Sequence, residues 1–239
     1  MPGFLPSVHG LPFANRFPPG PTITLGPLDL RALGIGDAST GLCGGMALTA
    51  LDLWAAGLTA PKDRPEPPAN GSRRFRAIVR RQVQSLDWLR VPLRYYDLQA
   101  FRPDPPVPWS RALRREPAHV AAIRDEWPRI RSGLDSAHPV VVGLIRQSGP
   151  WPADLARNHQ VLAFGYEVTP GSVVIRIYDP NHPGHDDVTL RADLARGATR
   201  EMPRWSLAQS TGEPLLGWFR EPYPAPSPAS VRAWCSNGT

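Results

Sequence analysis

The hydrophobic pattern divides the chain into a helical first half and a strand-rich second half. From Leu42 to Leu58 nearly every residue is apolar or small, and Asp52 is the only charged one. A segment that is apolar on all sides is typical of a helix in the middle of a domain. Gly57 near its end and Pro61 just beyond it are residues that commonly follow a helix. The pattern therefore predicts a buried central helix over 42–58.

A second helix is predicted over 72–89, and a less regular helical region over 118–135. In both, apolar residues recur every three or four positions, and arginines occupy the other face of the first. Pro128 interrupts the later region, so either one helix is kinked there or a new helix begins just before it. Between the two regions, the sequence predicts a short strand near Val91–Tyr96 and a long loop with several prolines.

From Pro139 onward, short apolar runs of strand length replace the helical spacing. The runs cover 139–146, 159–167 and 172–180, and a Thr-Pro-Gly turn separates the last two. Segments 186–190 and 217–223 are further strand candidates. Helices followed by strands joined in hairpins are the α+β pattern.

The length of 239 residues and the hydrophobic content of 41% suffice for a sizeable core, in one domain or in two closely packed lobes. Residues 1–36, which are rich in Pro, Gly and isolated aromatics, are interpreted as an extended arm. The main body then covers 37–224, with a helical lobe at about 37–135 and a sheet lobe at about 136–224. Residues 225–239 form a Pro/Ser-rich tail.

The charge of the chain does not indicate a nucleic-acid-binding protein. Lys and Arg total 27 and Asp and Glu total 21, for a net charge of +6. Lys62 is the only lysine, and such a bias toward arginine is what a GC-rich genome produces. The arginine face of the 72–89 helix lacks a phosphate loop or a stacking platform and is interpreted as solvated. We therefore expect neither nucleic acid nor membrane as a partner.

Targeting signals and cysteine usage suggest an intracellular protein. The N-terminus has no basic start followed by a continuous apolar stretch, so no secretory signal is predicted. No window approaches the ~18 uninterrupted apolar residues that span a membrane. Two cysteines, Cys43 and Cys235, do not make a disulfide framework. A cytoplasmic location is the default expectation, and export without a cleaved signal stays open.

Cys43 is the first candidate for chemistry, because it stands at the start of the predicted central helix. Unpaired backbone N–H groups and the helix dipole favour an anion at this position, and a cysteine is nucleophilic as the thiolate. Gly44 and Gly45, which follow it, are expected to leave room for a substrate to approach.

His159 begins one predicted strand, and Asp179 ends the next, at the turn DPNHPG. In a hairpin, the start of one strand and the end of its neighbour meet at the same edge of the sheet. If the start of the central helix packs on that edge, Cys43 joins them as a nucleophile beside a base and its orienting group. Cysteine catalysis needs an imidazole near the sulfur and a polar group on the other ring nitrogen.

This combination resembles the papain-like cysteine peptidase superfamily. The resemblance rests on the cysteine at a helix start, the strand NHQVLAFGY and a polar residue after the next strand, and it covers about 40–58 and 139–182. The CG turn with a strand ending in DP is closer to bacterial peptidases that process double-glycine leader peptides. The resemblance implies an α+β fold with a helical lobe, in which the central nucleophile helix packs on an antiparallel β-sheet lobe.

The resemblance also implies roles for individual residues. Cys43 corresponds to the nucleophile, His159 to the general base and acid, and Asp179 to the residue that orients the imidazole. Asn181 is the alternative third member, because papain itself uses an asparagine.

One position departs from the family pattern. Such enzymes carry a glutamine six residues before the cysteine, where its amide helps to hold the oxyanion; here this position is Asp37. A carboxylate would repel a developing oxyanion. Either Ser39, Thr40 or backbone N–H groups act as the donors, or catalysis is weak or absent.

The expected function is thiol-dependent hydrolysis of a peptide or isopeptide bond in a peptide or protein substrate, without cofactor or metal. The alternatives are a catalytically impaired papain-like binding module and an acyltransferase or transglutaminase-like enzyme with the same triad. The cluster NHPGHDD at 181–187 is interpreted as a polar turn, because metal ligands usually come with helical spacing or a CxxC partner. The oligomeric state stays open.

Overall fold

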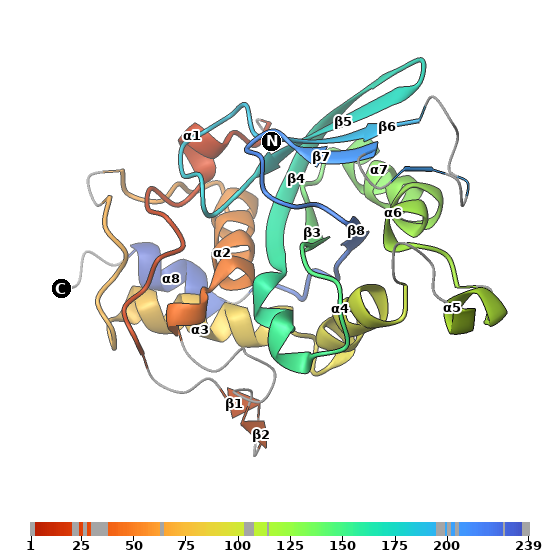
Figure 1. Ribbon diagram of the computed structural model, residues 1–239. Helices are drawn as coiled ribbons and strands as arrows, with labels where there is room; N and C mark the ends of the chain where they lie inside the picture. Colours follow the sequence, from red (N-terminus) through yellow and green to blue (C-terminus); the bar gives the residue numbers. More distant parts are fainter. Residues whose placement is uncertain are drawn as a thin grey trace.

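The computed structural model describes residues 3–20, 24–25, 28–29, 38–62, 65–102, 108–113, 115–194, 199, 202–203, 206–226 and 228–235. Helices occupy most of the first half of the chain and strands most of the second (Figure 1). The helical elements are α1 (Pro6–His9), η2 (Ala38–Thr40), α2 (Cys43–Ala55), α3 (Arg73–Ser85), α4 (Arg90–Ala100), α5 (Pro108–Ala112), α6 (Ala118–Ala121), η3 (Ala122–Glu126), α7 (Trp127–Asp135), η4 (Pro152–Arg157) and α8 (Pro228–Cys235). The strands are β1 (Thr24–Leu25), β2 (Leu28–Asp29), β3 (Val140–Ile145), β4 (His159–Thr169), β5 (Ser172–Tyr178), β6 (Thr189–Asp193), β7 (Leu207–Gln209) and β8 (Gly217–Arg220).

Six strands form one antiparallel sheet in the order β7-β6-β5-β4-β3-β8, while β1 and β2 pair separately. The β4–β5 hairpin lies at its centre and carries a register shift between Ala163 and Gly165. Strand β8 returns from the C-terminal part of the chain to pair with β3. Helices followed by an antiparallel sheet confirm the predicted α+β class.

Helices cover both faces of the sheet. On one face, Val140 and Val142 of β3 share a core with residues of α6, η3 and α7. On the other face, Val141 of β3 and Leu162 of β4 pack against α2. Figure 1 shows α2 and α3 on one side of the sheet and α6 and α7 on the other. Successive residues of a strand point to opposite faces, so a sheet covered on both sides needs continuous apolar runs.

Helix α2 is buried along nearly its whole length, as its composition predicts. Its single charge, Asp52, forms a fully buried ion pair with Arg81 of α3 at 2.9 Å. The hydroxyl of Tyr223 donates to the same carboxylate oxygen at 2.8 Å. A buried charge is tolerated when it is paired and hydrogen-bonded, so these contacts explain the charge in an apolar helix. Within the described residues, no helix is long and apolar enough to cross a membrane.

The N-terminal arm and helix α8 pack on the α2–α3 pair. Phe13 and Phe17 of the arm are buried in one core with Met46 of α2 and Phe75 of α3. The ring of Trp234 in α8 stacks on that of Phe13, with 6.4 Å between their centroids. The arm is therefore part of the core on this side of the molecule. Cys235 ends α8, and its side chain lies outside the described part of the structure.

The main difference from the predicted elements is helix α4, which stands where a short strand was expected near Val91–Tyr96. Pro92 lies in the first turn of α4, where a missing N–H costs no hydrogen bond. Val91, Tyr95 and Leu98 are buried and follow helical spacing. The strand prediction was wrong because the buried positions of this segment follow helical spacing and Pro92 lies where a helix tolerates proline.

Other boundaries also shift. Helix α3 ends at Ser85 instead of near 89, and Asp87 and Trp88 then adopt positive φ values of 41° and 59°. In 118–135, η3 is a π-helical segment, and α7 begins at Trp127 with Pro128 in its first turn. The chain stays helical without a break from 118 to 135, so the change before Pro128 is from a π-helical to an α-helical segment and not the start of a separate helix.

The strands agree better with prediction than the helices. β3, β4, β5 and β8 begin within one residue of their predicted starts, or at them. β6 covers 189–193 instead of 186–190, and the short strand β7 at the sheet edge was not predicted.

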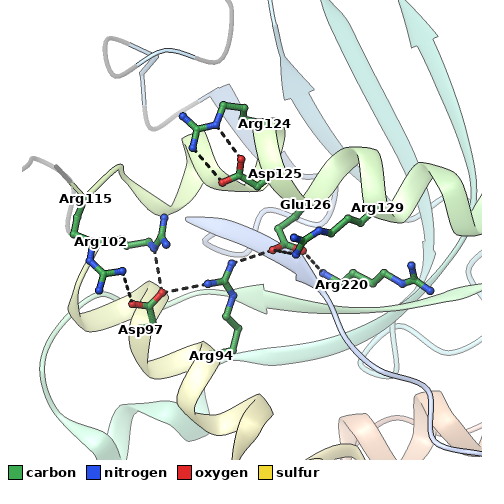
Figure 2. A network of polar contacts seen from close by, with 9 residues as sticks. All are labelled: Arg94, Asp97, Arg102, Arg115, Arg124, Asp125, Glu126, Arg129 and Arg220. Carbon is green, nitrogen blue, oxygen red and sulfur yellow. Dashed lines mark hydrogen bonds and ion pairs between the residues drawn. The ribbon is translucent and has the colours of Figure 1, made fainter. Parts of the chain in front are cut away.

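A network of ion pairs attaches α4 to the rest of the fold (Figure 2). Arg94 of α4 lies 3.2 Å from Asp97 in its own helix and 2.9 Å from the buried carboxylate of Glu126 in η3. Glu126 also pairs with Arg129 of α7 and accepts a hydrogen bond from the backbone N–H of Arg220 in β8. The neighbouring residue Tyr95 is thereby held against the sheet, where it becomes part of the site described next.

Candidate active site

Cys43 is the first residue of α2 and is half-buried. The chain enters the helix through Gly41, whose φ of +99° lies in a region that L side chains rarely adopt. The helix begins directly afterwards, with Leu42 as its N-cap residue. The turn therefore delivers the cysteine side chain to the N-terminal end of a buried helix, as the sequence predicts.

Gly44 and Gly45 serve packing, and this corrects the expectation that they open a path for substrate. A Cβ atom on Gly44 would overlap the Oε1 atom of Gln160 in β4 and lie 2.5 Å from the Oγ atom of Ser85 in α3. A Cβ atom on Gly45 would overlap the carbonyl oxygen of Ile78 in α3. Both glycines thus face the protein interior, where α2 approaches α3 and β4 more closely than any side chain permits.

His159 and Asp179 meet at one edge of the β4–β5 hairpin. The Nε2 atom of His159 lies 2.7 Å from the Oδ1 atom of Asp179, and both side chains are buried. The register explains this contact: Leu162 pairs with Tyr178, so the start of β4 faces the residue that follows β5. The juxtaposition predicted from the hairpin is confirmed.

Cys43 and His159 line the same cavity, and the Cys43 side chain is close enough for its charge to act on the ring of His159. Since Nε2 of the ring is engaged by Asp179, Nδ1 is the nitrogen available to the sulfur. Burial of the ring lowers the pKa of His159, but the charges of Asp179 and Cys43 and the hydrogen bonds to them outweigh it and raise this pKa to about 9. The ring is therefore held as an imidazolium beside the Asp179 carboxylate at neutral pH.

Asp179 is held by more than the histidine. Burial raises its pKa, but the charge of His159, the hydrogen bonds from His159 and from the N–H of Asn181, and the charge of Arg146 hold the pKa well below its usual range. Its Oδ2 atom accepts a hydrogen bond from Gln209 at 2.8 Å. Gln209 accepts in turn from Arg146, whose guanidinium lies 3.6 Å from the same carboxylate. Asp179 is thus ionised and fixed in orientation.

A chain of buried polar side chains runs behind Cys43. The N–H of Gly45 donates to Oε1 of Gln82 at 2.8 Å, and Gln82 in turn donates to Gln160 at 3.5 Å. Gln160 donates to Glu221, and the hydroxyl of Tyr95 lies 2.9 Å from the same carboxyl group. This chain connects the helix of the cysteine to the strand of the histidine.

Tyr95 links this series of hydrogen bonds to the histidine, since its hydroxyl also lies 2.7 Å from the backbone carbonyl of His159. One hydroxyl proton can serve only one of its two acceptors. Burial raises the pKa of Glu221 to about 7, against the hydrogen bonds from Gln160 and Tyr95, which lower it. A protonated Glu221 donates to Tyr95 while Tyr95 donates to the carbonyl of His159, so that the Glu221 carboxyl and the Tyr95 hydroxyl each have a donor and an acceptor.

A cavity of about 250 Å³ opens beside Cys43 and His159. Its apolar wall comes from Leu86, which follows the last residue of α3, from Val91 and Pro92 of α4, and from Leu155 of η4. Its polar lining includes Asn15 of the N-terminal arm and two arginines, Arg146 and Arg157. Among the described residues, no carboxylate lines this cavity. The cavity therefore offers an apolar surface and positive charge next to the sulfur.

The remaining predicted residues are placed as follows. Asn181 lines the cavity, but Asp179 and not Asn181 contacts the histidine ring. Ser39 is exposed and lines the cavity. Asp37 lies outside the described residues, as does the side chain of Thr40.

Several residues of the site were not predicted from the sequence, namely Asn15, Gln82, Tyr95, Arg146, Gln160, Gln209 and Glu221. They come from elements far apart in the chain, and no spacing or motif marks them. For the cluster at 181–187, the ring of His182 lies 2.7 Å from Glu213. Among the described residues, no group of three or more His, Cys, Asp or Glu side chains is arranged to hold a metal ion.

The comparisons with known proteins found no matching family model, no matching curated protein and no matching solved structure. What can be inferred about function therefore comes from the geometry of Cys43, His159 and Asp179.

Proposed function

We propose that the protein is a thiol-dependent hydrolase with a papain-like fold, which cleaves a peptide or isopeptide bond. One observation carries this proposal. The imidazole of His159 is hydrogen-bonded to the Asp179 carboxylate, and His159 and Cys43 line one cavity, in which the charge of Cys43 acts on the ring. This is the arrangement of nucleophile, base and orienting residue that acyl transfer through a thioester requires.

The chemistry follows from these contacts. The thiolate of Cys43 attacks the substrate carbonyl carbon, and the C=O π electrons move onto the oxygen, where backbone N–H groups at the start of α2 stabilise them. His159 gives its proton to the leaving amine as the C–N bond breaks, which leaves a thioester and a neutral imidazole. His159 then takes a proton from water, the water oxygen attacks the thioester, and Cys43 leaves as the thiolate. Asp179 keeps the ring oriented throughout.

The fold supports a papain-like assignment in its chain order. The cysteine comes first, at the start of a central helix, followed by the histidine at the start of a strand and the aspartate after the next strand. The helix packs on an antiparallel sheet, and its first residue lines the same cavity as His159.

Alkylation with iodoacetamide tests the proposal without knowledge of the substrate. Cys235 supplies an internal reference thiol, and mass spectrometry distinguishes the two sites. We expect Cys43 to react about tenfold or more faster than Cys235 at pH 7, because a thiolate is the reactive species. His159→Ala should remove this advantage, and His185→Ala, an exposed histidine, should not.

Labelling of Cys43 at the rate of Cys235 would instead indicate a protein that keeps the fold as a binding module. When the fast labelling is found, an acyl-enzyme formed with an activated ester shows which acceptor is used. Release by water supports hydrolysis, whereas release that depends on an added amine indicates an acyltransferase.

A further inference from the structure

The backbone N–H groups at the start of α2 are not all available to a substrate. A helix leaves its first N–H groups without acceptors inside the helix. Here, the N–H of Leu42 donates to Oδ1 of Asn15 at 2.6 Å, and that of Gly45 donates to Gln82. The N–H of Met46 closes the first turn on Leu42. Among the described residues, the N–H groups of Cys43 and Gly44 have no acceptor. The unsatisfied donors therefore lie at the sulfur itself.

Asn15 contributes one more donor at this point. Because its Oδ1 atom accepts from the N–H of Leu42, the orientation of the side-chain amide is determined, and the NH2 group (Nδ2) is the other end of the amide. Nδ2 lies 2.8 Å from the place that a Cβ atom of residue 41 would occupy, so Gly41 makes room for it. Nδ2 donates to no described residue, and Asn15 lines the cavity together with Cys43.

The arm that carries Asn15 is fixed in place. The backbone N–H of Asn15 donates to the carbonyl of Pro180 at 2.9 Å, directly after Asp179. Phe13 and Phe17 on either side are buried in the core with α2 and α3. The amide is thus a preorganised donor, which is what stabilisation of a transition-state charge requires.

We propose that Nδ2 of Asn15 and the backbone N–H of Cys43 together bind the oxyanion that forms when Cys43 attacks a carbonyl group. This inference rests on the function proposed above and adds a catalytic residue to it. The oxygen that receives the C=O π electrons accepts both hydrogen bonds and releases them when the electrons return and the leaving group departs. Papain-like enzymes use a glutamine side chain as this donor, and here Asp37 occupies that sequence position. Asn15 would take over the role of the glutamine amide.

Two reagents separate this role from the reactivity of the thiol. Acylation of Cys43 by p-nitrophenyl acetate passes through an oxyanion, whereas alkylation by iodoacetamide does not, and both consume the same thiolate. The ratio of the two rate constants therefore cancels any change in the amount of thiolate. The experiment uses the full chain with Cys235→Ser, and Cys43→Ala gives the blank.

Two substitutions at Asn15 are compared. Asn15→Asp keeps an oxygen for the N–H of Leu42 but removes the donor, and Asn15→Ala removes both. We expect the ratio of acylation to alkylation to fall by about 10²-fold in each, since loss of one oxyanion donor costs about that factor. Asn70→Ala is the matched control, because Asn70 binds the same arm at the carbonyl of Pro19 and lies outside the cavity. Its ratio should stay within about twofold of the unsubstituted protein, because no donor to the oxyanion is lost.

The result that overturns the inference is a ratio within about threefold of the unsubstituted value in both Asn15 variants, because loss of an oxyanion donor costs far more. An unchanged ratio overturns the inference even when the acylation and alkylation rates both fall, since Asn15 would then only position the thiol. Failure of the proposed function has a different signature: Cys43 of the unsubstituted protein would react with iodoacetamide no faster than Cys235. That outcome overturns both proposals.

Discussion

The Nε2 atom of His159 lies 2.7 Å from the Oδ1 atom of Asp179, and both side chains are buried. The carboxylate is held from its other side by Gln209 at 2.8 Å and by Arg146 at 3.6 Å. The Asp179 carboxylate is thus a fixed anion beside the imidazole of His159, which lines the same cavity as Cys43. Its charge is one of the reasons why the pKa of His159 is raised to about 9.

Asp179→Asn should therefore lower the pKa of His159. Burial alone lowers this pKa, and the charges of Asp179 and Cys43 are what raise it, so removal of one charge shifts the titration toward lower pH. NMR titration of the His159 ring measures the change directly, from about 9 in the unsubstituted protein to a value at least about one unit lower, given the strength of such charge pairs. Asp187→Asn, an exposed carboxylate, is the control. A ring that still titrates near pH 9 without Asp179 would contradict this prediction.

Much of this hairpin could be predicted from sequence because its determinants are local. The apolar runs that become β3, β4 and β5 and the turn between β4 and β5 set the pairing, and the pairing alone brings His159 to Asp179. The central helix is equally local: its composition indicates burial, and Gly57 marks its end with a φ of +70°.

The parts that could not be predicted depend on contacts between distant segments. α4 is helical because Val91, Tyr95 and Leu98 pack against the sheet, and Pro92 is compatible with the first turn of the helix. Asn15 of the N-terminal arm accepts a hydrogen bond from the backbone N–H of Leu42, and no sequence motif predicts this contact. Gly44 was interpreted as clearing a path for substrate, whereas it makes room for Gln160. The sequence shows the glycine but not which distant residue packs against it.

Gly44→Ala tests the close packing behind the cysteine. The added Cβ atom would overlap Gln160 and crowd Ser85, both buried, so we expect a loss of about 1–3 kcal/mol in the free energy of unfolding from overpacking. Chemical denaturation monitored by fluorescence gives this value. Gly165→Ala is the matched control, because its nearest neighbour would be an Arg176 carbon at 3.9 Å and its φ is not positive. Equal unfolding midpoints for the two variants would show that the site tolerates a side chain at 44.

Glu221→Gln should change the pH dependence of stability. The folded protein holds the proton of Glu221 up to about pH 7, whereas an unfolded glutamate releases it near its ordinary pKa of 4.5. Between these values the folded state binds more protons, so this group destabilises the fold as pH rises, by about 3 kcal/mol at most. Glutamine mimics the protonated acid: its amide donates to Tyr95 and its carbonyl accepts from Gln160.

Urea unfolding at pH 5 and pH 8 measures the effect. The difference in stability between the Glu221→Gln variant and the unsubstituted protein should be small at pH 5 and should favour the variant at pH 8. Because the two proteins share His159, its own titration cancels in this difference. Glu126→Gln is the control, since Glu126 is buried but accepts from Arg94 and Arg129 and should lose stability at both pH values. A difference that does not change with pH would show that Glu221 is ionised throughout.

Arg157→Glu should alter the preference of the site for charged acyl groups. The cavity beside Cys43 is lined by Arg146 and Arg157 and, among the described residues, by no carboxylate. Arg146 forms an ion pair with Asp179, so its replacement would disturb the triad. Arg157 is exposed and, within the part of the chain that the structure describes, pairs only with Asp154, at 3.4 Å. An acyl group with a negative charge near the scissile bond should therefore react faster than a neutral one of similar size. Mono-p-nitrophenyl succinate and p-nitrophenyl butyrate are such a pair.

We expect Arg157→Glu to lower the ratio of the succinate to the butyrate acylation rates by about tenfold, which corresponds to roughly 1.4 kcal/mol of charge interaction at a partly exposed site. The effect should weaken as the ionic strength rises, because exposed charges are screened. Arg191→Glu, which reverses an exposed charge on β6 away from the cavity, should leave the ratio unchanged. If both reversals lower the ratio equally, net charge and not the cavity sets the preference, and Arg157 has no part in substrate selection.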